Sequence, residues 1–178
     1  MGENKDFYSE AKGQMRLSER IVAAIPGYRG YKEKELRRES DKLLRNHLYL
    51  KLNTAEKDLK NVFQKLSDKR YFDVLTSMDR VVARMDRLVE KINHANYGYS
   101  GFFDIIKVKE ENLDRMIDFD NSLVKEVELL SADIASLESD MKNGETKDMS
   151  KKIENISDKI EDLEDTFDQR DEVIRGVS

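Results

Sequence analysis

The stretch 75–92, LTSMDRVVARMDRLVEKI, decides the fold, because its apolar residues step alternately by three and four from Leu75 to Ile92. The stretch 48–66, LYLKLNTAEKDLKNVFQKL, has the same alternation. Apolar residues at these steps line one side of an α-helix and form the seam of a coiled coil. The two stretches therefore predict two helices that pack along their lengths.

Two further seams follow in the second half of the chain. One runs from Leu113 to Met141 and the other from Met149 to Ile174, and each is interrupted by one charged residue, Asp120 in the first and Arg170 in the second. Pro and Gly separate the periodic segments. The sequence therefore predicts helices over residues 9–24, 32–68, 71–96, 109–142 and 146–175, the last beginning with Thr146 as its N-cap.

Short breaks between long helices favour antiparallel neighbours. The seams match in register, because Leu48 faces Ile92 at one end of the first hairpin and Leu66 faces Leu75 at the other. The predicted fold class is all-α: an elongated antiparallel bundle of two long coiled-coil-like hairpins plus a short N-terminal helix, in a single domain 1–178. Heptad seams can close within one chain or between chains, so the sequence does not decide whether the chain forms a homo-oligomer.

The register of the second hairpin also predicts a structural ion pair. Asp120 and Arg170 fall in the same layer, where a register slipped by one heptad would place each charge against an apolar side chain. We expect this pair to fix the register. The alternative is that both residues lie on the wet edge of the bundle and never meet.

Composition excludes several classes of protein. The chain has no Cys, 39% charged residues and no apolar run near the roughly 18 residues of a membrane span, so we expect a cytoplasmic protein without disulfides or a transmembrane segment. Neither His47 nor His94 has a Glu three residues before it, and no glycine-rich phosphate loop occurs. We expect no enzyme, no cofactor and no metal site.

Charge divides the chain into a basic and an acidic half. Residues 1–95 carry a net charge of +6 and residues 96–178 a net charge of −11. Two interpretations remain: the hairpins attract each other, which we favour, or each presents a different surface to a partner.

Aromatic residues gather at the two main breaks, 26–31 and 97–104, which hold six of the 14 aromatics and four of the 8 glycines. The predicted hairpins bring both breaks to one end of the bundle, together with the start of the helix 32–68; we call this end the pole. Tyr, Phe and Arg anchor protein interfaces. The candidate partner-binding residues are Tyr28, Arg29, Tyr31, Lys32, Lys34, Arg37, Arg38, Tyr97, Tyr99, Phe102, Phe103 and Asp104.

A structural interpretation of the same residues competes with this one. In it the aromatics cap the bundle, and the cations pair along the helix, Glu33 with Arg37 and Asp41 with Arg45. The functional interpretation predicts a non-enzymatic scaffold or adaptor that binds a protein partner, and leaves open whether that partner is membrane-associated. Its rivals are a nucleic-acid-binding helical protein and a membrane-surface-associated helical hairpin protein that polymerises.

The stretches GYRGYKEKE at 27–35, continuing through Arg37, Arg38, Asp41, Lys42 and Arg45, and YGYSGFFD at 97–104 carry a resemblance. Together these stretches cover about a sixth of the chain. Through them the chain resembles a family of uncharacterised prokaryotic all-helical proteins encoded near flotillin-like (SPFH) membrane scaffold proteins. The resemblance implies no activity and no established site. It does imply a cytoplasmic accessory or scaffold role.

Overall fold

The computed structural model describes residues 19–31, 33, 36–95, 110–145 and 147–175, and 89% of these residues are helical. The all-α fold class is therefore confirmed. A short helical segment covers residues 19–24, and four long helices follow: α2 (Arg37–Asp68), α3 (Phe72–His94), α5 (Glu110–Asn143) and α6 (Met149–Arg175). No residue of the described part lies in a β-strand.

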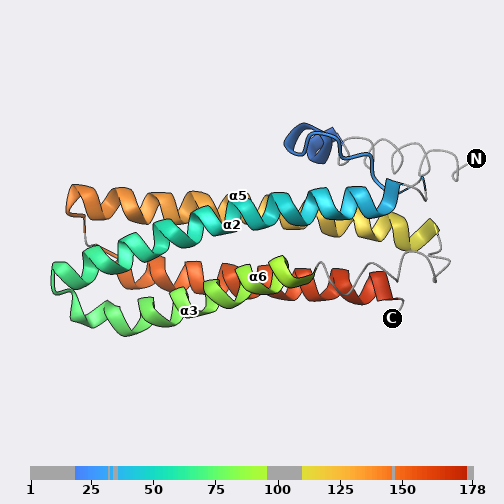
Figure 1. Ribbon diagram of the computed structural model, residues 1–178. Coiled ribbons are helices and arrows are strands. Elements are labelled where there is room, and N and C mark those ends of the chain that lie inside the picture. Colours follow the sequence, from blue (N-terminus) through green and yellow to red (C-terminus); the bar gives the residue numbers. More distant parts are fainter. Residues whose placement is uncertain (1–18, 32, 34–35, 96–109, 146, 176–178) are drawn as a thin grey trace, which may run out of the picture.

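The four long helices form a bundle (Figure 1). α2 packs against α3 and α5, and α6 packs against α5 and α3. The α2–α3 turn and the α5–α6 turn lie at one end of the bundle, and Gly144 has a φ of +75° in the second turn. The two predicted antiparallel hairpins are present and lie side by side; that the whole chain 1–178 is one domain stays a prediction.

The predicted helix boundaries need small corrections. α2 begins at Arg37 rather than at residue 32, and α6 begins at Met149, directly after Asp148, whose φ is +62°. A residue in the left-handed region cannot continue an α-helix, so α6 cannot extend back through this position. The predicted N-cap, Thr146, lies outside the described residues, as does the first helix before residue 19.

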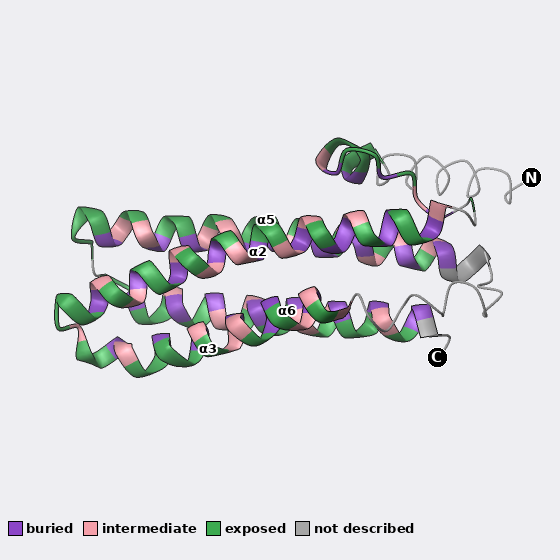
Figure 2. Cartoon of the chain, viewed as in Figure 1, coloured by how far each residue is buried: buried purple, intermediate pink, exposed green. Residues whose placement is uncertain are grey.

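The core is the row of predicted seams, drawn in purple along the inner faces of the helices in Figure 2. In α2, every seam residue from Leu48 to Leu66 is buried. In α3 the prediction was partly wrong, because Leu75 and Val82 are only half-buried while Val81 is buried. α3 contacts both α2 and α6, and a helix with two neighbours buries a wider stripe than a single seam. The further buried residues that the single seam omitted are Val74 and Leu88.

Ion pairs between the hairpins follow the charge division. Lys65 of α2 contacts Glu138 of α5 at 2.9 Å, and on the opposite side Lys91 of α3 contacts Asp168 of α6 at 2.6 Å. Arg84 of α3 likewise pairs with α6. In these pairs the basic first half supplies the cation and the acidic second half the anion, which supports attraction between the hairpins. Partly exposed pairs each add only about 0–1 kcal/mol, so they orient the hairpins more than they stabilise them.

Candidate functional site

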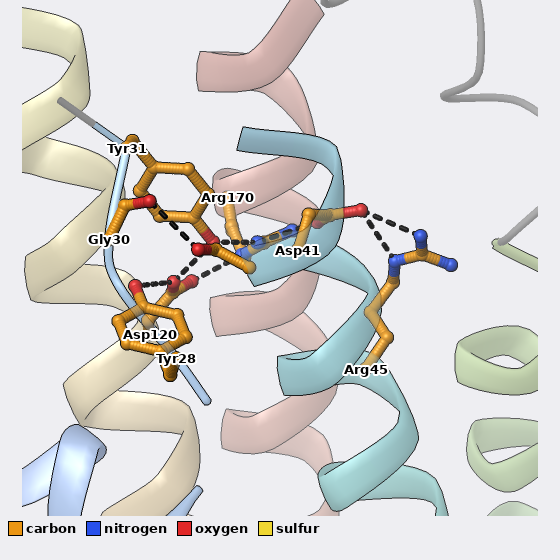
Figure 3. A network of polar contacts seen from close by, with 8 residues as sticks. Tyr28, Gly30, Tyr31, Asp41, Arg45, Asp120 and Arg170 are labelled. Carbon is orange, nitrogen blue, oxygen red and sulfur yellow. Dashed lines mark hydrogen bonds and ion pairs between the residues drawn. The ribbon is translucent and has the colours of Figure 1, made fainter. Parts of the chain in front are cut away.

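A buried polar network lies where the chain enters α2, and Figure 3 shows its side chains pointing toward one another. Residues 19–31, which we call the strap, run along the outside of α2 and α5 (Figure 1). The strap buries Ile21 and Ile25, at 1% and 3% exposure. Its loop turns through Gly27 and Gly30, whose φ angles of +86° and +73° favour glycine. This path carries the two strap tyrosines into the bundle.

The centre of the network is the predicted ion pair. The Arg170 Nε atom donates to Asp120 Oδ1 at 2.6 Å, and the two side chains are 1% and 0% exposed. The prediction that these residues share a layer and pair is therefore confirmed. The alternative, that both lie on a wet edge, is wrong because neither side chain reaches solvent.

Both strap tyrosines complete the shell of Asp120. Tyr28 donates its hydroxyl to Asp120 Oδ2 at 2.8 Å, and Tyr31 donates to the same oxygen at 2.5 Å. The two rings meet edge to face, with centroids 6.0 Å apart and an interplanar angle of 89°. The Asp120 carboxylate thus accepts three hydrogen bonds, one from α6 and two from the strap.

Arg170 extends the network to α2. Its Nη2 atom donates to Tyr31 Oη at 2.9 Å and to Asp41 Oδ1 at 2.8 Å. Asp41 in turn accepts from Arg45 Nη2 at 2.6 Å, so the expected pair of Asp41 with Arg45 along α2 is confirmed. Two carboxylates and two guanidinium groups alternate, and their formal charges cancel.

Burial sets the protonation of this cluster. Burial and the neighbouring Asp120 carboxylate raise the pKa of Tyr28 and of Tyr31 far above the ordinary tyrosine value, so both hydroxyls stay protonated and act as donors. Burial also raises the pKa of Asp120, while the Arg170 guanidinium and the Tyr31 hydroxyl oppose that rise. For Arg170, burial lowers the pKa, but Asp120, Tyr31 and Asp41 together outweigh it, so the pKa rises and the guanidinium stays charged.

Side chains of α2 fasten the strap backbone on both sides of the tyrosines. Ser40 donates its hydroxyl to the Gly30 carbonyl at 2.8 Å and accepts from the Arg29 amide at 3.4 Å. Arg37 donates from Nε to the Tyr31 carbonyl at 2.7 Å. The strap is therefore fixed by side-chain and backbone contacts together.

These positions change the prediction for the pole. Tyr28, Tyr31 and Arg37 are buried, at 3%, 0% and 6% exposure, so a partner cannot reach their side chains while the network is closed. Their contacts follow the structural interpretation, but Arg37 donates to the Tyr31 carbonyl, and the expected pair of Arg37 with Glu33 is not among the ion pairs of the described residues. Arg29 and Arg38 are exposed. The other predicted residues lie outside the described part: Lys32, Lys34, Tyr97, Tyr99, Phe102, Phe103 and Asp104. The predicted contact between segments 26–31 and 97–104 falls there too.

The contact of Asp41 with Arg170 was not predicted from the sequence. Continued backwards from Leu48, the α2 seam reaches Arg45 or Leu44, then Asp41 and Arg37, so the core stripe is largely polar at the start of α2. A polar continuation opposite the Asp120–Arg170 layer was the available signal. Ser40 offered no comparable one, because a single serine on a helix carries no pattern.

The bonds of this site hold elements of the fold together. Its titratable groups are buried and bonded to one another, apart from Arg170 Nη1, which has no hydrogen-bond partner among the described atoms. In the described part of the chain, no group of three or more His, Asp or Glu side chains is arranged to hold a metal ion. In the same part, no helix is long and apolar enough to cross a membrane.

No family model, curated protein or solved structure matches the chain. The resemblance to prokaryotic helical proteins encoded near flotillin-like scaffold proteins therefore stays an expectation.

Proposed function

We propose that the chain is a non-enzymatic helical scaffold or adaptor that binds a protein partner through its pole. Arg29 is the residue we expect to touch the partner first. It is exposed, and it stands between two buried anchors, Tyr28 and Tyr31. Arg38, which is also exposed, is the second residue that we expect to take part.

The fixed position of Arg29 carries the proposal. Its neighbours donate to Asp120, and its own amide donates to Ser40. A recognition residue held by a rigid backbone loses less conformational entropy when it binds, and so gives more affinity. A buried network of four charged side chains that anchors this short exposed loop would hold Arg29 ready for binding. A loop that only closes the bundle does not need an arginine in a fixed position.

An affinity pull-down from native lysate tests the proposal, with Arg29→Glu as the variant. Because the Arg29 side chain is exposed, charge reversal leaves the network intact, whereas changes of Tyr28 or Tyr31 would open it and confound the result. The matched control is Arg80→Glu, an exposed arginine on α3. We expect one protein to be lost with Arg29→Glu and kept with Arg80→Glu; identical captured proteins for both variants would contradict the proposal.

Nucleic acid is the rival partner, because it would use the same cations. Nuclease treatment of the lysate separates the two. A captured protein that survives nuclease supports the adaptor, and capture that disappears with nuclease and falls steeply with salt supports the rival.

A further inference from the structure

The end of the bundle opposite the network carries an exposed aromatic ring. There α2 turns into α3 and α5 turns into α6 (Figure 1), and we call these two turns the tip. Phe72, the first residue of α3, is 67% exposed, more than any other large hydrophobic side chain of the described residues. Lys69 Nζ donates to the Met141 carbonyl at 2.9 Å and ties the two turns together. The ring therefore projects from a fixed position.

A hollow of about 280 Å³ lies between the two turns, and both sequence neighbours of Phe72 line it. Its residues come from both hairpins: Tyr71, Asp73 and Val74 from the first, and Asp148, Met149 and Ser150 from the second. The hollow is half open to solvent, and its lining is about as polar as it is apolar. Its volume exceeds that of an apolar cavity of about 150 Å³ that admits benzene, so a phenyl ring fits by size. Phe72 of the same chain does not line it.

We propose that two copies of this chain associate tip to tip, each placing its Phe72 ring in the hollow of the other. A two-fold interface needs a surface that is complementary to itself. A projecting ring beside a hollow of sufficient size meets that requirement, since one rotation brings both rings to both hollows. The association buries the most exposed aromatic side chain in the described chain.

Charge favours the tip over the long acidic side of the bundle. Among the α6 side chains that the structure describes, the exposed charged ones are Lys151 and these acids: Glu154, Asp158, Glu161, Asp162, Asp165, Asp168 and Glu172. Lys152 and Lys159 are partly exposed, and Arg84 and Lys91 of α3 pair with two of the acids, yet this face stays acidic overall. Two such faces repel each other. Around the hollow, by contrast, exposed cations and anions alternate, with Arg70 and Lys147 beside Asp73 and Asp148. Two tips can therefore pair opposite charges.

The backbone of the tip supports a role for Arg70. Its φ of +61° lies in the left-handed region, where glycine is the usual residue after a helix. Arginine at this position is less stable than glycine would be. A charged side chain in a strained turn, directly before the hollow-lining Tyr71, fits a contact across the two-fold axis.

Sedimentation velocity from about micromolar to about millimolar protein tests the association, because an interface at a tip is small and weak. We expect a dimer to form with concentration, and Phe72→Ala to raise its dissociation constant about thirtyfold or more, as for a central aromatic anchor. Leu50→Ala, a 55% exposed residue in the middle of α2, is the control and should leave the constant unchanged. A monomer at every concentration, or a dimer insensitive to Phe72→Ala, overturns the proposal.

The absence of cysteine makes a second measurement direct. Ser150→Cys at the rim of the hollow should give a cross-linked dimer with a short bifunctional maleimide, while Ser136→Cys on the exposed side of α5 should not. Arg70→Gly should raise the urea midpoint of unfolding and weaken the dimer, opposite effects that a purely structural residue would not show.

A lipid surface is the other occupant to be tested. Flotation with vesicles of equal parts phosphatidylcholine and phosphatidylglycerol measures it. Loss of flotation in Phe72→Ala, combined with a monomer in solution, would assign the ring to a membrane and overturn the dimer.

Discussion

Removing the Arg170 guanidinium is the most informative change to the buried network. In Arg170→Met the side chain keeps much of its volume, but Asp120 retains only the two tyrosine hydroxyls, and Asp41 retains only Arg45. Breaking a buried pair by removing one partner costs about 3–5 kcal/mol. Because the Arg170 side chain is 1% exposed, we expect the free energy of unfolding to fall by an amount in this range.

A second variant separates the charge effect from lost packing. It carries Arg170→Met together with Asp120→Leu, Tyr28→Phe and Tyr31→Phe. This set removes the stranded carboxylate and both donors that pointed at it, and Asp41 keeps its own cation, Arg45. Replacing the pair alone with leucine would leave two buried hydroxyls without an acceptor, at about 1–3 kcal/mol each. We therefore expect the quadruple variant to be more stable than Arg170→Met alone.

Urea unfolding followed by far-ultraviolet circular dichroism measures both free energies. For a chain of this length, a loss of about 3 kcal/mol corresponds to a lower Tm by roughly 6–12 °C, so thermal scans give an independent value. A quadruple variant that is no more stable than Arg170→Met would refute the idea that the unpaired Asp120 carboxylate causes the loss. It would mean that packing around Arg170, rather than its charge, holds the end of the bundle.

Three further predictions use the same unfolding assay. Tyr31→Phe should lower the free energy of unfolding by about 1.5–3 kcal/mol, and by more than Tyr28→Phe does, because only the Tyr31 hydroxyl also accepts a hydrogen bond from the Arg170 guanidinium. Equal losses in the two variants would argue against that bond. Burial and then Lys51 lower the pKa of His47 below 6.5, so the unfolded chain binds more protons than the folded one, and the free energy of unfolding should fall as the pH drops below about 6.5. His47→Gln should remove that part of the pH dependence; an unchanged slope of unfolding free energy against pH would contradict the prediction. Gly30→Ala should cost about 1–2 kcal/mol through its φ of +73° alone, since no atom lies within 4 Å of the added Cβ, and Gly30→Asn should cost less.

The long seams made the fold predictable from the sequence. A heptad stripe fixes both which side of a helix is buried and how two helices align, so the hairpin pairings and the layer of Asp120 and Arg170 followed from residue numbers alone. The pattern was less informative for α3. A single seam describes contact with one neighbour, whereas Val81 is buried because α3 lies against two.

The strap was harder to predict because it obeys no period. Tyr28 and Tyr31 lie among glycines in a segment that reads as a surface loop, and aromatic residues in such loops resemble interface anchors. Their burial depends on an acceptor in α5, 89 residues or more along the chain, and no local pattern points to it. The ion pair was visible from the sequence, but the third element that it binds was not.

This third element changes what the ion pair does. A single pair between α5 and α6 sets the register of one hairpin, as a polar layer does in a coiled coil. Here Asp120 also holds the strap and Arg170 also holds Asp41 of α2, so one cluster fixes three helices and a loop relative to one another. Such a cluster adds little net stability compared with apolar packing. Its contribution is position: each element is bonded to at least two of the others, so a shift by a helical turn breaks several bonds at once, and Arg29 keeps one place on the surface.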